Sequence, residues 1–317
     1  MKKLVCCGEI LVEIMAERLG QSFLEPGPLV GPFPSGAPAI FVAQAAALGQ
    51  PAGLIGAVGD DAFGQVNIAR LRRLGADVSA IRVHPGWPTG SAFVAYQADG
   101  SRQFVYNMKH SAAGLIALTP EAEALLEGAD HMHVMGTALF SEDAIAVARR
   151  GIEAVKSRGG TVSFDPNIRA EMIEMPGMRD ALAFALGHAD VFLPSGEEMF
   201  HFTKARSEAS AAAELVARGV KVVVVKKGPE GAVLYDRDGR TAVPGFRVEE
   251  VDPTGAGDCF GAGFVSRWLA GDTSEAALRI ANACGALAVT AKGPMEGIAT
   301  LEEVETFLAS QSAGSVA

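Results

Sequence analysis

The second half of the chain alternates short apolar runs with longer stretches that have helical periodicity. The apolar runs cover residues 131–136, 161–165, 190–194 and 222–226. Regular alternation of strands and helices is typical of a parallel sheet covered by helices. An earlier apolar run at residues 4–8 ends in glycine and predicts a buried first strand. The pattern therefore predicts an α/β fold.

Two β-rich runs stand apart from this alternation. Residues 93–96 and 104–106 are rich in aromatic and β-branched side chains, and they flank Asp99-Gly100, a strong hairpin signal. We therefore expect a small separate β-sheet formed by about residues 12–33 and 88–110.

A glycine-rich turn and a helix are predicted at residues 251–268. Phe260, Phe264 and Trp268 recur every fourth residue and give one apolar helical face. Pro253 fits neither a sheet ladder nor a helix interior, so the turn is expected there. The small residues that follow leave backbone N–H groups uncovered at a helix N-terminus, where an anion is stabilised. These small residues are Gly255, Ala256 and Gly257.

Asp258 directly follows this turn and places a carboxylate beside the predicted anion site. A carboxylate repels an anion, so it does not serve binding alone. It fits a reaction in which it takes a proton from a nucleophile that attacks a bound phosphate. The alternative is a structural one, in which Asp258 caps the helix.

Composition limits the class of protein. The 317 residues suffice for one large α/β domain or two modest ones, and 49% are hydrophobic, so a sizeable core is expected. A net charge of −10 argues against a nucleic-acid-binding surface. The four cysteines do not suggest a disulfide framework, which fits a reducing cytoplasm. No apolar span is long enough for a membrane helix, and the N-terminal run is too short for a signal peptide.

Several local features carry structural expectations. Asp60 or Asp61 is expected to cap the helix that follows. Asp272 is expected to cap another helix, with Glu275 three residues on, and the glycine at 293 to end it. His131 and His133 share one strand face, a spacing that a metal site could use, but without a third ligand nearby we expect core histidines.

The stretch Asp-Pro-Thr-Gly-Ala-Gly-Asp at 252–258, followed by Phe-Gly-Ala-Gly-Phe at 260–264, resembles the C-terminal signature of ribokinase-type (PfkB) carbohydrate kinases. The resemblance extends over nearly the whole chain. It implies a single ribokinase-like domain over residues 1–317, a three-layer α/β/α sheet with a small β-lid over a sugar pocket. It also implies ATP and Mg²⁺ as cofactors, K⁺ as a further candidate, and a homodimer that pairs through the lid.

The resemblance assigns residues to the sugar side of the site. An acidic residue at the place of Glu13 holds sugar hydroxyls in the family, although an exposed strand-end glutamate is the alternative. The stretch from Ser35 to Ala39 resembles the N-terminal sugar-binding signature, with Ile40 where the family has asparagine. The substrate-binding residues expected are Glu13, Gly36, Ala37, Asn107 and Asp258.

The resemblance also assigns the nucleotide side. In the family, the strand end at 226–231 binds nucleotide and small residues on the last helices let adenine lie flat, although a solvated lysine and close helix packing are the alternatives. The cofactor-binding residues expected are Ser195, Lys226, Gly228, Gly255, Gly257, Asn282 and Ala286.

Ions and charge stabilisation complete the expected site. Glu198 matches the glutamate of the family's Asn-x-x-Glu motif, which helps to hold Mg²⁺, while Ser195 replaces the asparagine. Asp252 is the candidate K⁺ ligand. Arg169 ends the hexapeptide Phe-Asp-Pro-Asn-Ile-Arg, which resembles fructokinases and 2-keto-3-deoxygluconate kinases, and it would steady phosphate or sugar oxygens. The expected catalytic set is Asp258, Gly255, Ala256, Gly257 and Arg169.

The leading function is therefore an ATP-dependent kinase of a small sugar. Keto-acid kinases, as we interpret their pattern, have an arginine where this chain has Met108, and strand alternation would turn Lys109 to the other face. We expect a neutral ketose such as fructose or tagatose, with 2-keto-3-deoxygluconate as the alternative. Nucleoside kinases and a non-catalytic sugar-binding regulator remain further alternatives. A nicotinamide oxidoreductase and a P-loop kinase lack their glycine motifs here.

Overall fold

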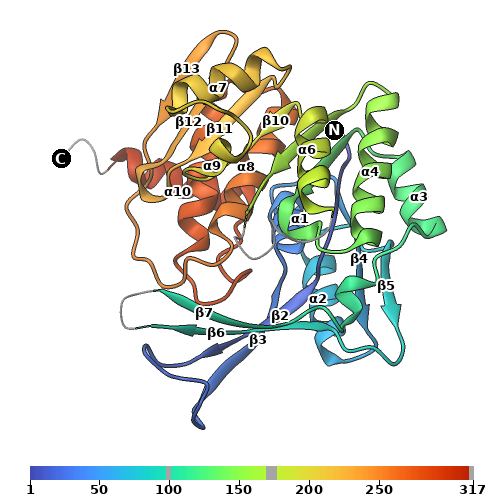
Figure 1. Cartoon of the computed structure of the whole chain (residues 1–317). Coiled ribbons are helices and arrows are strands. Elements are labelled where there is room, and N and C mark those ends of the chain that lie inside the picture. The colour runs from blue at the N-terminus through green and yellow to red at the C-terminus, as the bar shows by residue number, and fades with distance from the viewer. Residues whose placement is uncertain (98–100, 169–176, 314–317) are drawn as a thin grey trace.

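The computed structural model describes residues 1–97, 101–168 and 177–313, and the side chains of those residues up to 311. The chain forms a nine-stranded main sheet in the order β13-β12-β11-β10-β9-β8-β1-β4-β5 and a four-stranded sheet in the order β3-β2-β6-β7 (Figure 1). The expected architecture, an α/β/α sheet with a small β-lid, is confirmed.

The main sheet is parallel except at one edge. Strand β1 pairs in parallel with β4 and β8, whereas β12 and β13 are antiparallel. The strands are β1 (Leu4–Cys7), β4 (Ala52–Gly59), β5 (Ile81–His84), β8 (His131–Met135), β9 (Thr161–Asp165), β10 (Val191–Phe192), β11 (Val222–Lys226), β12 (Ala232–Asp236) and β13 (Gly239–Val243).

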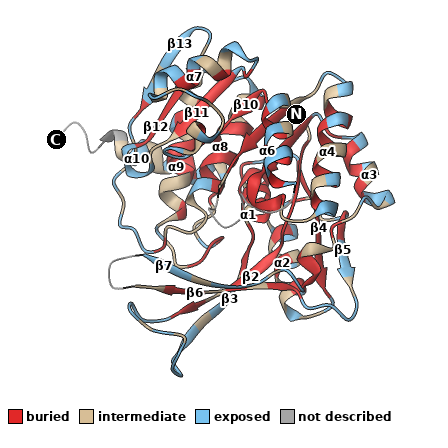
Figure 2. Cartoon of the chain, viewed as in Figure 1, coloured by how far each residue is buried: buried red, intermediate tan, exposed pale blue. Residues whose placement is uncertain are grey.

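Two apolar clusters, one on each face of the sheet, separate the helices into two layers. The first layer is α1 (Ala37–Ala47), α2 (Ala62–Arg73), α8 (Ala256–Ala270), α9 (Ser274–Ala288) and α10 (Leu301–Ala313). The second is α3 (Pro120–Glu127), α4 (Glu142–Ser157), α6 (Met178–His188) and α7 (Glu208–Ala217). The central strands are buried between the layers, whereas lid strand β7 is mostly exposed and lid strand β3 is buried only at its end (Figure 2).

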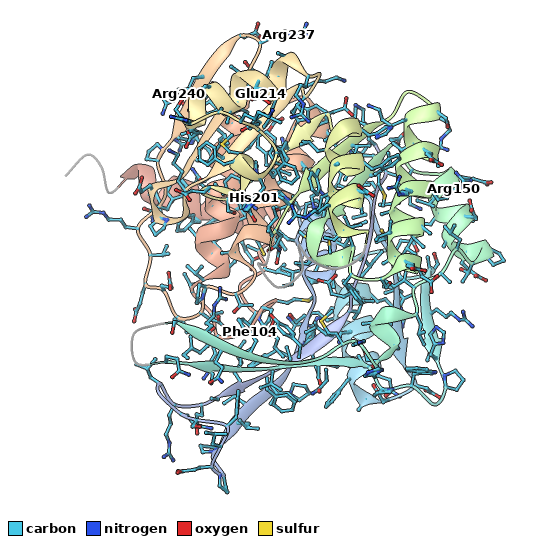
Figure 3. The ribbon with its side chains drawn as sticks, in the orientation of Figure 1. Phe104, Arg150, His201, Glu214, Arg237 and Arg240 are labelled. Carbon is cyan, nitrogen blue, oxygen red and sulfur yellow. The ribbon has the colours of Figure 1, made fainter. Side chains whose placement is uncertain are left out.

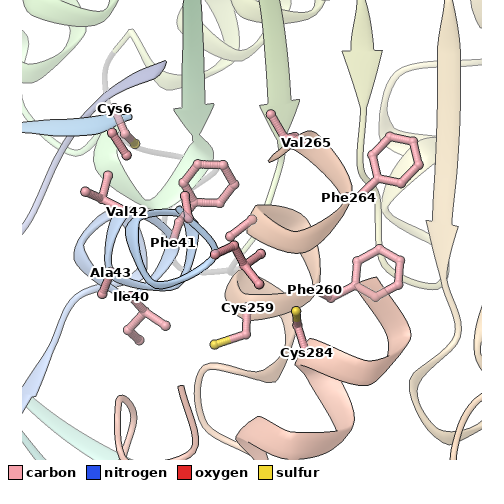
Figure 4. Close-up of a cluster of buried hydrophobic side chains, with 14 of the residues drawn as sticks. Cys6, Ile40, Phe41, Val42, Ala43, Cys259, Phe260, Phe264, Val265 and Cys284 are labelled. Atoms are coloured by element: carbon pink, nitrogen blue, oxygen red, sulfur yellow. The ribbon is translucent and has the colours of Figure 1, made fainter. Parts of the chain in front are cut away.

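Helix α8 is buried almost all round rather than on one apolar face. Its side chains meet those of α1 and α9, with Phe41 of α1 and Cys284 of α9 close to Cys259 and Phe260 (Figure 4). Small residues permit this close approach, since a Cβ on Gly263 would lie 3.0 Å from the Cys284 Sγ. The core therefore fixes the start of α8 firmly.

The lid consists of β2 (Leu11–Ala16), β3 (Leu29–Ser35), β6 (Gly90–Tyr96) and β7 (Arg102–Asn107). Strand β2 pairs in parallel with β6, which pairs antiparallel with β7. In Figure 1 this sheet crosses below the main sheet, on the side of loops that precede α8.

Of the expected helix ends, one is confirmed and two are wrong. Asp61 caps α2 by accepting from the Gly64 amide, as expected. The Asp272 expectation was wrong, because Thr273 caps α9 while Asp272 pairs with Arg267 at 2.7 Å. The glycine at 293 does not end that helix either, since α9 ends at Ala288.

His131 and His133 are core residues, as expected. The Ser163 hydroxyl lies 2.7 Å from a ring nitrogen of each, and His133 stacks on Phe41 at 3.6 Å between centroids. No group of three metal-ligating side chains occurs in the part of the chain that the structure describes. Burial lowers the pKa of His131 to about 3 and that of His133 well below its usual value.

These two histidines make stability depend on pH. In the unfolded chain a histidine gains its proton near pH 6.5, whereas native His131 resists protonation until about pH 3. The unfolded state therefore binds more protons across that window, and stability falls as the pH drops. Relative to pH 7.5, we expect His131 to lower stability by about 1 kcal/mol at pH 5.5, with a further loss from His133.

Urea unfolding at both pH values measures this loss. His131→Gln is expected to make the pH dependence shallower, whereas His110→Gln, a change at an exposed histidine, leaves it as in the wild type. Equal slopes in all three proteins would contradict the assignment.

Candidate active site

The turn before α8 has the geometry of an anion site. Gly255 is the N-cap with φ 82°, and a Cβ there would lie 2.6 Å from the Pro294 carbonyl oxygen, so glycine is required. The Cys259 amide donates to the Gly255 carbonyl at 2.9 Å. Gly257 lies earlier in the helix than Cys259, so its amide has no carbonyl within the helix to which it can donate. These donors at a helix N-terminus favour a bound anion.

Asp258 lies in the first turn of α8 and is 8% exposed. It is not the N-cap of the helix, which is Gly255, so the simple capping interpretation does not describe its position. Its carboxylate is near enough to Lys226 to contribute to that residue's raised pKa. The structure therefore places a carboxylate, an ammonium and a helix N-terminus together.

Lys226 ends β11 and points at the turn. A Cβ built on Gly257 would meet only the Lys226 Nζ, at 3.8 Å. The same Nζ lies 2.5 Å from the Asp165 Oδ2 at the end of β9, and the Asp165 side chain is 1% exposed. Burial would lower the pKa of Lys226, but the nearby carboxylates of Asp165, Glu198 and Asp258 outweigh it and raise that pKa. The lysine therefore carries a fixed positive charge.

Glu198 belongs to the same charged cluster. Its carboxylate accepts from the Ile168 amide and from the Ser195 amide, both at 2.6 Å. Burial and then the negative charge of Asp165 raise the pKa of Glu198 above its usual value. The cluster thus holds more negative charge than Lys226 offsets, which fits a divalent cation nearby.

Asp252 is buried in the loop that leads to the turn, at 1% exposed. Its Oδ1 accepts from the Tyr96 hydroxyl at 2.5 Å and from the Thr254 amide at 3.0 Å, and its Oδ2 accepts from the Gly293 amide at 2.9 Å. Within the described ranges no lysine or arginine forms an ion pair with this carboxylate. A buried carboxylate without a cationic partner fits a monovalent cation beside it.

A cavity of about 1160 Å³ opens beside the turn. Gly228 has φ 54°, and a Cβ at this position would have no other atom within 4 Å, so a ligand can approach the backbone here. Asn282 donates to the Val243 and Pro244 carbonyls at 3.2 and 3.1 Å and so ties α9 to the end of β13. The lining includes Ser195, Lys226, Gly228, Ala256, Gly257, Asn282 and Ala286.

The sugar-side residues lie on lid strand β2 and at the start of α1, directly after lid strand β3. Glu13 is 7% exposed and its Oε1 accepts from the Ser35 hydroxyl at 2.7 Å. Gly36 is the N-cap of α1 with φ 110°, and a Cβ there would lie 2.4 Å from the Glu9 carbonyl oxygen. Ala37 starts that helix. Ile40 lies against the turn, because its Cγ2 is 3.3 Å from the Cβ position of Gly255.

The strand register separates Asn107 from this group. Glu13 is in register with Ala92, whereas Asn107 is opposite Ser91. Successive residues of a strand face opposite sides, so Asn107 and Glu13 lie on different faces of the lid. Asn107 lines a separate hollow of about 600 Å³. The strand register therefore does not bring Asn107 and Glu13 to the same face of the lid.

Two further expectations depend on the segments around these strands. Arg169 lies outside the described residues. Strand β7 ends at Asn107, and the Ser111 amide donates to the Met108 carbonyl at 3.1 Å. Lys109 is therefore in a turn, and the expectation that strand alternation orients it was wrong.

Sequence reasoning missed Asp165 and Tyr96. Asp165 is part of the quoted hexapeptide, and its place at the end of an apolar run was a usable signal. The contact between Tyr96 and Asp252 joins residues 156 positions apart, and no local pattern indicates it.

The chain has relatives along its whole length. The family model described as pfkB family carbohydrate kinase matches residues 1–301. Fructokinase-1 of Oryza sativa subsp. japonica is 33% identical over 98% of this chain and 98% of its own. A solved structure of a putative ribokinase II from E. coli with ATP and Mg²⁺ is 46% identical, with a TM-score of 0.92 over 98% of this chain and 99% of that chain.

A second solved structure is more distant. It is a fructokinase double mutant from Vibrio cholerae O395 in fructose, ADP and potassium ion bound form. It is 27% identical, with a TM-score of 0.80 over 97% of this chain and 98% of that chain.

Proposed function

Because the chain belongs to the pfkB family of carbohydrate kinases, we propose that it transfers the γ-phosphate of ATP to a hydroxyl of a small sugar. The observation that carries this proposal is the helix N-terminus at Gly255–Gly257 with Asp258 and Lys226 beside it. An anion-binding turn next to a carboxylate suits phosphoryl transfer to a hydroxyl. We take residues 1–317 as one kinase domain whose lid comes from about 12–33 and 88–110.

In this proposal each part of the turn has a separate task. Asp258 accepts the proton of the attacking hydroxyl. Since an ordinary aspartate is a weak base, the proton moves together with phosphoryl transfer and not before it. The Gly255, Ala256 and Gly257 backbone stabilises charge on the transferred phosphoryl oxygens, and Lys226 adds a fixed positive charge. Arg169 is proposed as a further contact to phosphate or sugar oxygens.

The cofactors follow from the same charges. ATP would occupy the 1160 Å³ cavity, with its adenine near Ala286 and Asn282 and its phosphates toward Lys226 and Gly228. Mg²⁺ would neutralise the phosphates near Glu198, since Mg²⁺ is usually held by phosphates, waters and one or two carboxylates. K⁺ would lie beside Asp252. The E. coli relative binds ATP and Mg²⁺, and the Vibrio cholerae fructokinase binds potassium with fructose and ADP.

We propose a neutral ketohexose, of the fructose or tagatose type, as the sugar. Fructokinase relatives over the whole chain support this choice. The test is kcat/KM for D-fructose, D-tagatose, D-ribose, 2-keto-3-deoxygluconate and a nucleoside, with ATP and Mg²⁺. A ketohexose is expected to be the best substrate. A clear preference for the keto-acid would overturn the sugar assignment, and no phosphorylation of any would overturn the kinase.

We also propose a homodimer that pairs through the lid, working in the cytoplasm. Three apolar side chains on or next to the lid are solvent-exposed, namely Leu24 at 95%, Leu29 at 46% and Val105 at 44%. Exposed apolar groups on one small sheet favour a partner surface, and sedimentation of the purified chain measures this directly. The cysteines are all free and buried, which fits a reducing compartment. No described helix is long and apolar enough to cross a membrane.

A further inference from the structure

The far end of the lid hairpin touches the loop that leads into the phosphate-binding turn. Tyr96 ends β6 and Arg102 begins β7, and the two are opposite each other in the strand register. Tyr96 donates to the Asp252 Oδ1 at 2.5 Å, and the Arg102 Nη1 donates to the Thr254 Oγ1 at 3.3 Å. Thr254 directly precedes Gly255, the N-cap of α8. The lid thus contacts the chain one residue before the proposed phosphate donors.

Tyr96 is on the lid face that carries Glu13. Glu13 is in register with Ala92, and residues 92, 94 and 96 of β6 share one face. Phe104, labelled on the lid in Figure 3, is opposite Val94 and belongs to the same face. The proposed sugar-binding residue and the residue that contacts the turn therefore look into the same space.

Asp252 joins three separate segments through its two oxygens. The Thr254 amide and the Tyr96 hydroxyl share Oδ1, and the Gly293 amide donates to Oδ2. The third segment also meets the lid, because a Cβ on Gly293 would lie 2.7 Å from the Phe33 ring. The Tyr96 hydroxyl is thus part of the hydrogen-bonding that shapes the loop before α8.

The contact has the character of a reversible latch. The Tyr96 hydroxyl donates to the Asp252 carboxylate, which is 1% exposed. A hydrogen bond to a carboxylate is about twice as strong as one between neutral groups. A single such bond is nevertheless weak enough to open and reclose during a catalytic cycle.

We infer that Tyr96 is a positioning residue that couples closure of the lid over the sugar to the alignment of the phosphate-binding turn, through Asp252. This inference rests on the proposed function. The lid must open for a sugar to reach the space between Glu13 and Asp258, which breaks the contact, and reclosing remakes it. The nucleotide cavity has no lid residue among its described lining, because all of that lining lies between Ser195 and Val289. The latch should therefore affect ATP binding only through the turn residues that line this cavity, Ala256 and Gly257, and KM for ATP should change less than the sugar kinetics.

The test is Tyr96→Phe, which removes only the hydroxyl. The control is Tyr235→Phe. It removes a hydroxyl on β12, next to the edge strand β13, that donates to another carboxylate, that of Glu208, at 2.8 Å. We expect Tyr96→Phe to lower kcat/KM for the sugar by about tenfold or more, while KM for ATP stays within about twofold. The control should leave kcat/KM for the sugar unchanged.

Hydrogen exchange gives a readout that does not need activity. Peptides from β6 and β7 are expected to exchange faster in Tyr96→Phe than in the wild type or in Tyr235→Phe, because the lid opens more often. Unchanged lid exchange together with an unchanged sugar kcat/KM would overturn the inference. An equal rise in KM for the sugar and in KM for ATP would also overturn it, because general damage then explains the effect. If the wild type phosphorylates no sugar, the proposed function fails, but faster lid exchange still supports the latch.

Discussion

Replacing Asp258 by asparagine is expected to lower kcat by about 10²–10⁴-fold, the usual contribution of a positioned general base. Asparagine has nearly the same shape but cannot accept the hydroxyl proton. The fold should survive, because Asp258 is not the N-cap of α8 and the surrounding helix is buried by apolar contacts. ATP binding should be retained, since the variant removes a negative charge next to the phosphate site.

Steady-state kinetics with the best sugar and calorimetric titration of ATP separate the two effects. Asp143→Asn is the matched control, because Asp143 is also in the first turn of a helix but is exposed and belongs to α4, in the opposite layer. We expect its kcat to stay near that of the wild type. If Asp258→Asn turned over at a near-normal rate, Asp258 would not be the base.

The parts of the fold that follow from local patterns were predictable. The apolar runs at 131–136, 161–165 and 222–226 became β8, β9 and β11 within a residue. Asp61 was predictable as a cap because its side chain and the Gly64 amide are three residues apart. These outcomes depend only on neighbours in the sequence, which is why the sequence sufficed.

Other features depend on partners that are distant in the sequence. Both Asp272 and Thr273 could cap α9. Asp272 instead forms an ion pair with Arg267, and the Thr273 side chain caps the helix. The face on which Asn107 lies is set by its pairing with Ser91, which no local pattern fixes. Asp165 became a candidate site residue only when β9 and β11 placed it beside Lys226.

The buried pair of Asp165 and Lys226 gives a test that separates stability from function. Lys226→Met is expected to cost about 3–5 kcal/mol of unfolding free energy, because it leaves a buried carboxylate without its partner. Asp165→Asn should cost less than Lys226→Met, since Glu198 and Asp258 still face the lysine. The double variant should recover part of the loss, because methionine fills a volume close to that of lysine and position 165 no longer carries a charge, while Glu198 and Asp258 still lose the nearby ammonium.

The double variant should recover unfolding free energy but not the kinetics with ATP. Lys226 is the ammonium that faces Gly257, so kcat/KM for ATP should stay low in both Lys226→Met and the double variant. Lys3→Met is the matched control. Its partner Asp77 is 3.0 Å away and both side chains are partly exposed, so the expected cost is about 0–1 kcal/mol. Urea unfolding and ATP kinetics are measured on the four variants and the wild type. Additive losses in the double variant would show that the pair is not coupled, and restored ATP kinetics would show that Lys226 does not serve the phosphates.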